Sequence, residues 1–388
     1  MLLLVAVLAM FHSYVIFPWL LQWMAIGKSL PYQRYAANHH WPRIYVLFSV
    51  FNEEKVIVQK IESLFNTAYP AELLEVYIGS DCSTDTTNDL IAAQLSRFPQ
   101  LRLLPYQQRS GKAGVLNKLT AEMGLEQLPE DAILVLTDAN VMFHPETLHE
   151  LAAYFSDKRV GQVGANVINR ISGEGVAAQE QQYISRENMI KYREGLLWGA
   201  MQGAFGACYA VRPSLFPQLP GNFLMEDFYV SMNVLQQGYH AILNPEALCE
   251  EDVPGDVKEE FKRKTRISTG NIQNLMVYWR ILFHERYVGF CFLSHKVLRW
   301  LGPLWLLMIG VGLALLAPFG IIWKCLLMGY ILTIATPLAD ALLARWGWHW
   351  PLLRLIAYFI AMNVALALGF WRYIRGVQSG AWSPTKRN

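Results

Sequence analysis

Four long apolar segments constrain this chain of 388 residues more than any other feature of its sequence. Residues 2–26 contain no charged side chain and are long enough to cross about 30 Å of hydrocarbon as a helix. Three further segments follow near the C-terminus, at residues 300–319, 321–343 and 355–371. A secretory signal peptide is the alternative for the first segment, but a basic n-region and a small-residue cleavage site are missing. We therefore predict a membrane protein with one N-terminal and about three C-terminal transmembrane segments.

The apolar segments divide the chain into five predicted parts. These are a transmembrane anchor at 1–27, an α/β domain at 38–275, interfacial amphipathic helices at 276–300, transmembrane segments at 301–375 and a basic tail at 376–388. Lys28, Arg34 and Arg43 follow the anchor, and the positive-inside rule then places the large domain in the cytoplasm. A second basic cluster near the C-terminus conflicts with three further full crossings. One C-terminal segment could therefore be re-entrant or interfacial.

Composition limits the partners and the compartment. The formal net charge is only +2, which gives no electrostatic reason to expect nucleic acid as a partner. Hydrophobic residues make up 53% of the chain, in agreement with a multi-pass membrane protein. The five cysteines contain no CxxC pair and are odd in number. This pattern argues against a disulfide framework or a zinc site and indicates a reducing compartment.

The large domain reads as an α/β fold. Strands are expected over residues 43–51, 74–79, 101–104 and 133–136, each followed by a helical stretch, the first of them opening at Asn52 to Glu54. Strands that alternate with helices predict a mostly parallel sheet with right-handed crossovers. Ligands of such sheets bind at the carboxyl ends of the strands.

Polar residues gather at these strand ends. They are Asn52, Glu53, Asp81, Asp85, Lys112 and Asp138. Asp and Asn are ordinary turn formers, so each one alone could mark only a turn. Together they suit a nucleotide: Asp81 can accept a hydrogen bond from the imide N–H of a base, Lys112 can neutralise a phosphate, and Asp138 can bind a divalent cation that bridges a diphosphate. We predict a nucleotide site at this edge of the sheet.

Five ordered motifs carry a resemblance to a known family. They are FNEE (51–54), SDCSTDTT (80–87), SGKAGVLN (110–117), TDAN (137–140) and MEDFYVSMNVLQQGY (225–239). This set resembles the membrane-bound family 2 glycosyltransferases, including synthases of exopolysaccharide and hyaluronan. The resemblance implies a GT-A fold and the transfer of a sugar from a nucleotide donor.

The resemblance also implies roles for single residues. Asp81 resembles the aspartate that holds the base of the donor, and Lys112 lies in the donor-binding loop. Asp138 matches the first acid of the DxD motif, which positions the diphosphate and a metal cofactor, Mg2+ or Mn2+. Asn140 replaces the second acid, and its amide oxygen could still ligate the metal. Asp227, with Glu226 beside it, matches the general base, although acids at that place could also cap a helix.

Two further segments bear on the acceptor. Residues 203–213 resemble the acceptor-side segment of these enzymes, or form only a strand between glycine turns. Where processive members carry QxxRW, this chain offers Arg263 and Arg266, without the glutamine and the tryptophan. Either arginine could bind the donor diphosphate. The alternative is a basic helix face beside anionic lipid headgroups.

The resemblance therefore implies an inverting glycosyltransferase of the cell inner (plasma) membrane, with its catalytic domain in the cytoplasm. It would transfer a sugar from a UDP-sugar to a lipid-linked acceptor, such as a polyprenyl-diphosphate-linked glycan, or to a polysaccharide. One alternative is a processive polysaccharide synthase that also extrudes its polymer, although the missing tryptophan counts against this. The other alternative is a catalytically silent, nucleotide-binding membrane scaffold.

Overall fold

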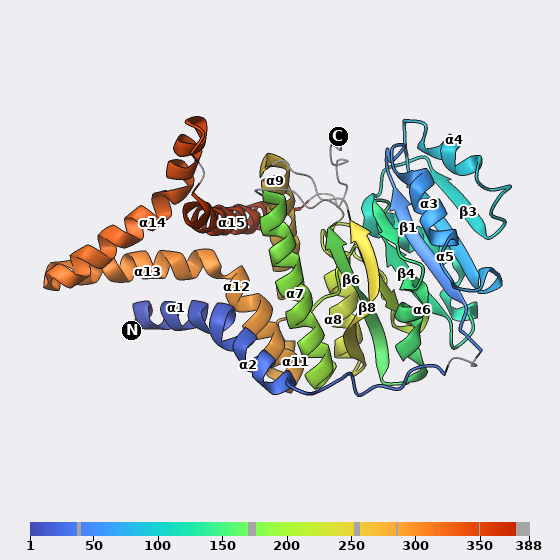
Figure 1. Ribbon diagram of the computed structural model, residues 1–388, viewed down its shortest axis with the longest axis horizontal. Helices are drawn as coiled ribbons and strands as arrows, with labels where there is room; N and C mark the ends of the chain where they lie inside the picture. The colour runs from blue at the N-terminus through green and yellow to red at the C-terminus, as the bar shows by residue number, and fades with distance from the viewer. Residues whose placement is uncertain (37–39, 170–175, 252–256, 285, 349, 378–388) are drawn as a thin grey trace. The chain divides into compact units, whose positions relative to one another are not determined.

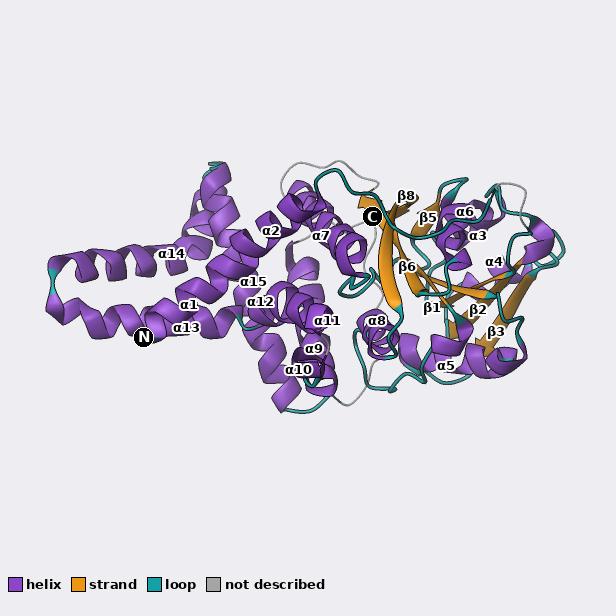
Figure 2. Ribbon diagram, turned by 90° about the horizontal axis from the view of Figure 1, so that it is seen from below, coloured by secondary structure: helices purple, strands orange, loops and turns teal. Residues whose placement is uncertain are grey.

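The computed structural model describes residues 1–36, 40–169, 176–251, 257–284, 286–348 and 350–377 (Figure 1). The chain forms two compact units. The first comprises Met1–Leu20, Asp256–Val277 and Phe292–Gly376, and the second comprises Leu21–Gly255, Tyr278–Cys291 and Val377–Asn388. All eight described strands, drawn in orange in Figure 2, belong to the second unit.

The second unit contains one eight-stranded sheet. The strands are β1 (Ile44–Val50), β2 (Leu74–Asp81), β3 (Leu101–Tyr106), β4 (Ile133–Thr137), β5 (Val141–Phe143), β6 (Val160–Asn169), β7 (Cys208–Val211) and β8 (His240–Glu251). Their order is β3-β2-β1-β4-β7-β6-β8-β5. The first four are parallel, β6 is parallel to β8, and β7 and β5 run antiparallel to their neighbours. The predicted mostly parallel sheet is confirmed, with all four expected strands present, and the structure shows it to be mixed.

Burial explains the central strands. Every residue of β1 and of β4 is buried, as expected for parallel strands that are covered on both faces. The two strands pair in parallel from Ile44 and Ile133 onward, and β1 pairs with β2 from Ile44 and Leu74 onward. The carboxyl ends of β1, β2 and β4 therefore lie at one edge of the sheet, where the strand order turns from descending to ascending.

Further elements of the second unit are helices, most of which contact strands of the sheet. They are α3 (Ile57–Phe65), α4 (Thr87–Ala92), α5 (Gly111–Met123), α6 (Thr147–Ala152), α7 (Val176–Trp198), α8 (Glu226–Gln236), α10 (Ile281–His284) and α11 (Arg286–Cys291), with short 3-10 turns at Ala71–Leu73, Leu125–Gln127, Ala153–Ser156 and Pro213–Leu215. The first of these helices begins later than expected. Asn52 has a φ of 54°, a left-handed conformation that a helix does not continue from, so α3 opens only at Ile57.

The first unit is helical. Its elements are α1 (Leu2–Phe11), a π-helical turn (His12–Ile16), the start of α2 (Phe17–Ala25), α9 (Val257–Tyr278), a second π-helical segment (Phe292–Val297), α12 (Leu298–Trp300), α13 (Gly302–Leu316), a 3-10 turn (Ala317–Phe319), α14 (Ile321–Arg345) and α15 (Pro351–Ile374). Among the residues that the structure describes, four helices are long and apolar enough to cross a membrane: Leu2–Ala25, Gly302–Phe319, Ile321–Arg345 and Pro351–Ile374. The four predicted apolar segments are thus confirmed as long helices.

Small residues set the contacts between the long helices. A side chain at Gly312 of α13 would place its Cβ 2.9 Å from the Cβ of Leu3, because α1 packs along α13. Close backbone approach at glycine is a common way for membrane helices to associate. Asp340, an acid within the apolar part of α14, lies 3.9 Å from the guanidinium of Arg354 on α15.

Candidate active site

The loops after β1 and β2 are held together by side-chain hydrogen bonds. The Oδ1 atom of Asn52 accepts from the backbone N–H of Thr84 at 2.8 Å, and the N–H of Glu53 donates to Thr87 Oγ1 at 2.8 Å. Asp85 Oδ1 accepts from the N–H of Thr87 at 3.0 Å, which satisfies a donor at the start of α4. The predicted residues Asn52, Glu53 and Asp85 therefore belong to one cluster at the edge of the sheet.

Asp81 ends β2 and is fully buried. Its carboxylate accepts from the backbone N–H of Ser110 at 2.7 Å, from the N–H of Gly111 at 3.0 Å and from Arg109 Nε at 3.0 Å. Gly111 has a φ of +72°, so the chain can turn there and present both N–H groups to the carboxylate. In this structure Asp81 fixes the loop that opens α5, and its contact with a base stays a prediction.

Arg109 was not singled out from the sequence. Its guanidinium carbon lies 3.4 Å from the centroid of the Phe51 ring, directly after β1, while its Nε bonds Asp81. The arginine thus joins the ends of two strands across the place where a base is expected. The sequence offered one signal for this residue, its position immediately before the SGK motif. Arginine at such a position can stack its cationic group on an aromatic ring.

Lys112 connects two other predicted residues. Its Nζ lies 2.7 Å from Asp138 Oδ1 and 2.7 Å from Glu226 Oε1, and it donates to the carbonyl of Gly206 at 3.4 Å. Burial alone would lower the pKa of Lys112, but the two carboxylates outweigh burial and hold this pKa well above its usual value. Three motifs that are far apart in the sequence, at 110–117, 137–140 and 225–239, therefore meet at one ammonium group.

Asp227 lies in the first turn of α8, beside this cluster, and is only 7% exposed. Its Oδ1 accepts from the N–H of Phe228 at 2.8 Å, while Gly206 faces Oδ2 so closely that a Cβ there would lie 2.8 Å away. Burial raises the pKa of Asp227 to about 6, helped by Glu226 and opposed by Lys112. A carboxylate with this pKa can accept a proton near neutral pH. The helix-dipole contact and a role as base are compatible.

Two more buried polar residues lie near Asp227 and were missed from the sequence. Lys191 on α7 is buried, with its Nζ 3.5 Å from the centroid of the Phe205 ring, and its charge lowers the pKa of Asp227. Tyr209 on β7 is buried, and within the described ranges its hydroxyl has no hydrogen-bond partner. Burial, with Glu226 nearby, raises the pKa of Tyr209 well above its usual value. Tyr209 lies within the segment 203–213 but was not singled out there, and Lys191 lies outside every motif identified in the sequence.

For the segment 203–213, the sequence left open whether it is an acceptor-side segment or only a strand between glycine turns. Cys208–Val211 forms strand β7, antiparallel to β4. The preceding loop contains Gly203, with a φ of +77°, and Gly206, which makes room for Asp227. The segment therefore lines the candidate site on its Gly206 side, and its role toward an acceptor stays a prediction.

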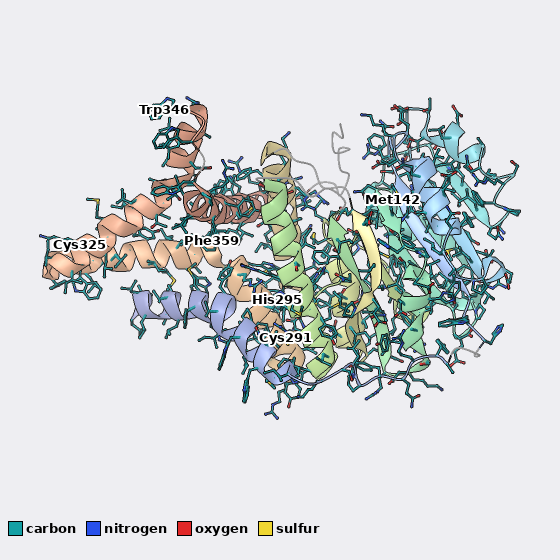
Figure 3. The ribbon with its side chains drawn as sticks, viewed as in Figure 1. Met142, Cys291, His295, Cys325, Trp346 and Phe359 are labelled. Atoms are coloured by element: carbon teal, nitrogen blue, oxygen red, sulfur yellow. The ribbon has the colours of Figure 1, made fainter. Side chains whose placement is uncertain are left out.

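The donor atoms of the turn after β4 suit a hard divalent cation. The side chain of Asp138 is 36% exposed, and Asn140, two residues later, is partly exposed. Strand β5 follows this turn, and its residue Met142 is labelled in Figure 3. Among the described residues, no group of three His, Cys, Asp or Glu side chains could hold a metal ion. One carboxylate and one amide oxygen fit an ion that also takes oxygens from a bound diphosphate, as Mg2+ commonly does.

Arg263 and Arg266 lie on α9, a helix of the first unit. Arg263 Nε donates to Glu260 Oε2 on the same helix at 2.9 Å, and Lys264 lies 3.3 Å from the same carboxylate. These contacts describe a charged helix face. The predicted contact of Arg263 and Arg266 with a donor diphosphate stays a prediction.

Two family models match the chain. The model described as "Glycosyl transferase family 2" matches residues 45–218, and the model described as "Glycosyl transferase family group 2" matches residues 133–374. The first match contains the motifs at 51–54, 80–87, 110–117 and 137–140. The second extends through the helices of the C-terminal part.

Two curated relatives are similar over much of the chain. The "Probable glycosyltransferase YdaM" of Bacillus subtilis is 24% identical over 285 residues, which cover 69% of this chain and 64% of that protein. The "Beta-monoglucosyldiacylglycerol synthase" of Synechocystis sp. is 24% identical over 352 residues, which cover 86% of this chain and 62% of that protein. The chain thus matches less than two thirds of the length of either relative.

One solved structure is similar along almost its whole length. It is the mannosyltransferase PcManGT from Pyrobaculum calidifontis, in complex with GDP-Man and Mn2+. The TM-score is 0.72 at 20% identity, with 96% of this chain and 99% of that chain covered. At this identity the likeness concerns the fold alone, and it confirms the predicted GT-A-like α/β fold with an N-terminal and three C-terminal apolar helices.

Proposed function

Because this chain belongs to glycosyl transferase family 2, we propose that it transfers a sugar from a nucleotide-diphosphate donor to an acceptor at a membrane, with inversion at the anomeric carbon. One observation carries the proposal: Lys112 bridges Asp138 and Glu226 at 2.7 Å each, beside the buried Asp227. This arrangement sets a cation for the leaving diphosphate next to a carboxylate for the attacking hydroxyl. Charge stabilisation and proton transfer are the two requirements of this reaction.

Asp227 is the proposed general base. The acceptor O–H bond breaks as its proton moves to the Asp227 carboxylate, and the acceptor oxygen forms a new bond to the anomeric carbon. The bond between that carbon and the diphosphate oxygen breaks, and the nucleoside diphosphate leaves with the electron pair. Oδ1 of Asp227 is bonded to the N–H of Phe228, so Oδ2, which faces Gly206, is the proposed proton acceptor.

Lys112 is the proposed binding group for the diphosphate. Its two carboxylate partners keep it charged, and its side chain is 18% exposed, so phosphate oxygens can reach it from the edge of the sheet. Asp138 and Asn140 are the residues that would hold a divalent cation, which supplies further charge neutralisation for the leaving group. Asn52, Glu53, Asp81 and Asp85 are proposed to shape the nucleoside side.

The proposed acceptor is a membrane lipid or a glycan linked to one. In the described part of the chain, four helices are long and apolar enough to span a membrane, and the Synechocystis relative is named for the glucosylation of a diacylglycerol. The donor proposed from the sequence is a UDP-sugar. GDP-mannose is the second donor to test, because the Pyrobaculum structure contains it. Family membership argues against a silent scaffold, and product length separates single addition from a processive synthase.

The test uses the full chain, purified in detergent and mixed with vesicles that contain diacylglycerol or a polyprenyl phosphate. A panel of UDP-sugars and GDP-mannose is supplied with Mn2+ or with EDTA, and donor binding, nucleotide release and labelled lipid are measured. We expect release with one donor, suppressed by EDTA, and a lipid that gains sugar. Absence of both donor binding and release across the panel would contradict the proposal.

A further inference from the structure

A lysine lies buried behind the turn that contains Asp138 and Asn140. Lys60 belongs to α3 and is fully buried, and its neighbours on the buried face of that helix are the apolar Ile57, Ile61 and Leu64. Its Nζ lies 4.0 Å from the centroid of the Phe143 ring. Lysine is almost never fully buried unless it is paired, because transferring an ammonium group out of water is unfavourable.

The ammonium group of Lys60 holds both ends of that turn. It donates to Thr137 Oγ1 at 3.0 Å and to the carbonyl oxygen of Val141 at 2.5 Å. Thr137 precedes Asp138 directly, and Val141 follows Asn140 directly. The two contacts therefore enclose the three residues that carry both candidate metal ligands.

The same network reaches the loop before β7. Thr137 Oγ1 donates to the carbonyl of Ala207 at 2.8 Å, and the backbone N–H of Asp138 donates to the same carbonyl at 3.2 Å. Gly206, the residue before Ala207, contacts both Lys112 and Asp227. Lys60 is thus linked through Thr137 to the backbone that supports the reactive cluster, although it does not touch that cluster itself.

Packing alone does not require a lysine here. A methionine would fill a similar volume among Phe48, Phe143 and the side chains of α3 without desolvating a charge. Burial lowers the pKa of Lys60 to about 8, which means that the fold disfavours its charged form relative to water. What the lysine adds is a pair of directed hydrogen bonds to the two ends of the turn.

We propose that Lys60 is a positioning residue that fixes the Thr137–Val141 turn, so that Asp138 and Asn140 are held ready to bind a divalent cation. The inference deepens the proposed function and rests on it in taking that cation to be the one that binds with the donor diphosphate. Groups behind metal ligands typically change metal affinity by about 10- to 100-fold when they are removed.

Two variants separate the contacts from the charge. Lys60→Met removes both hydrogen bonds of the lysine and its positive charge. Thr137→Val removes the hydrogen bond from Lys60 and the one to Ala207, and it leaves the charge. Binding of Mn2+ to the full chain is followed by the electron paramagnetic resonance of free Mn2+, with UDP or GDP present. We expect each variant to weaken Mn2+ binding, Lys60→Met by about tenfold. The Tm of Lys60→Met should equal or exceed that of the wild type, because a buried charge is gone.

Tyr69→Phe is the matched control. Tyr69 is buried in the same core and donates its hydroxyl to the carbonyl of Pro42, before the start of β1 and at the opposite edge of the sheet. It should leave Mn2+ affinity unchanged. With a functioning donor, saturating Mn2+ should also restore most of the turnover of Lys60→Met, as expected for a residue that acts through the metal ligands.

Three results would overturn the inference. The first is an unchanged Mn2+ affinity in both variants. The second is a lowered Tm of Lys60→Met with an unchanged Mn2+ affinity. The third is tighter Mn2+ binding in Lys60→Met, which would mean that the loss of repulsion between the lysine and the cation dominates. The wild type separates this failure from that of the proposed function. If the wild type binds Mn2+ with nucleotide, any of these three results refutes only the role of Lys60. If the wild type binds neither nucleotide nor Mn2+, both proposals are contradicted.

Discussion

The Asp227 carboxylate has a pKa of about 6, above its ordinary value of 3.8, because it is buried beside Glu226. We predict that transfer requires its ionised form and falls as the pH drops through about 6. Asp227→Asn should lower kcat by at least about 100-fold, the usual contribution of a general base, with the donor KM little changed. The measurement is the pH profile of nucleotide release for the wild type and the variant.

The same substitution should stabilise the fold. Folding raises the pKa of Asp227, so the protonated carboxyl group stabilises the fold. This stabilisation is fully present below the unfolded pKa of about 4 and is lost as the pH rises to about 6. At pH 7.5 the ionised Asp227 therefore costs about 2–3 kcal/mol, which the amide avoids. A Tm of Asp227→Asn below that of the wild type would contradict this account. Asp131→Asn, at an exposed position before β4, should change neither turnover nor Tm.

Lys112 provides a second prediction at the residue scale. Lys112→Met should weaken binding of the nucleoside diphosphate by about 10- to 100-fold, the loss expected for a charge-assisted hydrogen bond. It should also lower the Tm, because Glu226 loses its ion-pair partner in a side chain that is only 9% exposed. Isothermal titration with UDP and GDP measures the affinity. Equal affinity in the variant would show that the lysine serves only the ion pairs.

The residues that could be predicted share one property. Asp81 ends β2, Asp138 directly follows β4, and Lys112 lies at the start of the helix after β3, so their place at the edge of a parallel sheet follows from the strand pattern. Lys60 and Lys191 come from the middle of helices. Their positions depend on which face of a helix packs where, and the local sequence does not determine this.

Among the elements, the contact between α9 and α15 depends on one glycine. Gly369 packs against α9, where a Cβ would lie 2.8 Å from the carbonyl oxygen of Thr265 and closer still to Ser268. We predict that Gly369→Leu lowers stability by about 1–3 kcal/mol, as overpacking does. Gly329→Leu in α14 is the matched control, because a Cβ there meets nothing within 4 Å in the described structure. Thermal unfolding in detergent, followed by tryptophan fluorescence, compares the two. Equal Tm values would refute the contact.

The predictable elements were those with strong local signals. The buried apolar runs of β1 and β4 identified both strands, because parallel strands covered on both faces are continuously apolar. The strand β6 was not identified. Its sequence, VGQVGANVIN, contains two glycines and two kinds of polar amide, and it gains strand geometry from pairing with β7 and β8. Tertiary pairing decided that element.

At the scale of the whole molecule, the sequence left open on which side of the membrane the C-terminus lies. Within the first unit, Ser268 Oγ of α9 donates to the carbonyl of Leu366 at 2.9 Å, and Thr269 Oγ1 donates to the carbonyl of Gly369 at 3.2 Å. The charged face of α9, with Arg263 and Arg266, excludes that helix from hydrocarbon. We therefore expect the second half of α15 to lie at the depth of an interface.

We predict that α13 and α14 cross the membrane as a hairpin and that α15 lies along the cytoplasmic interface. The exposed Trp346, Trp348 and Trp350 between α14 and α15 suit that interface, and Arg372 and Arg375 then satisfy the positive-inside rule. Green fluorescent protein fused to the C-terminus should fluoresce in bacteria, and alkaline phosphatase fused there should be inactive. Phosphatase fused after Gly320, at the turn of the hairpin, should be active. An active phosphatase at the C-terminus would instead require four full crossings, with the basic residues outside.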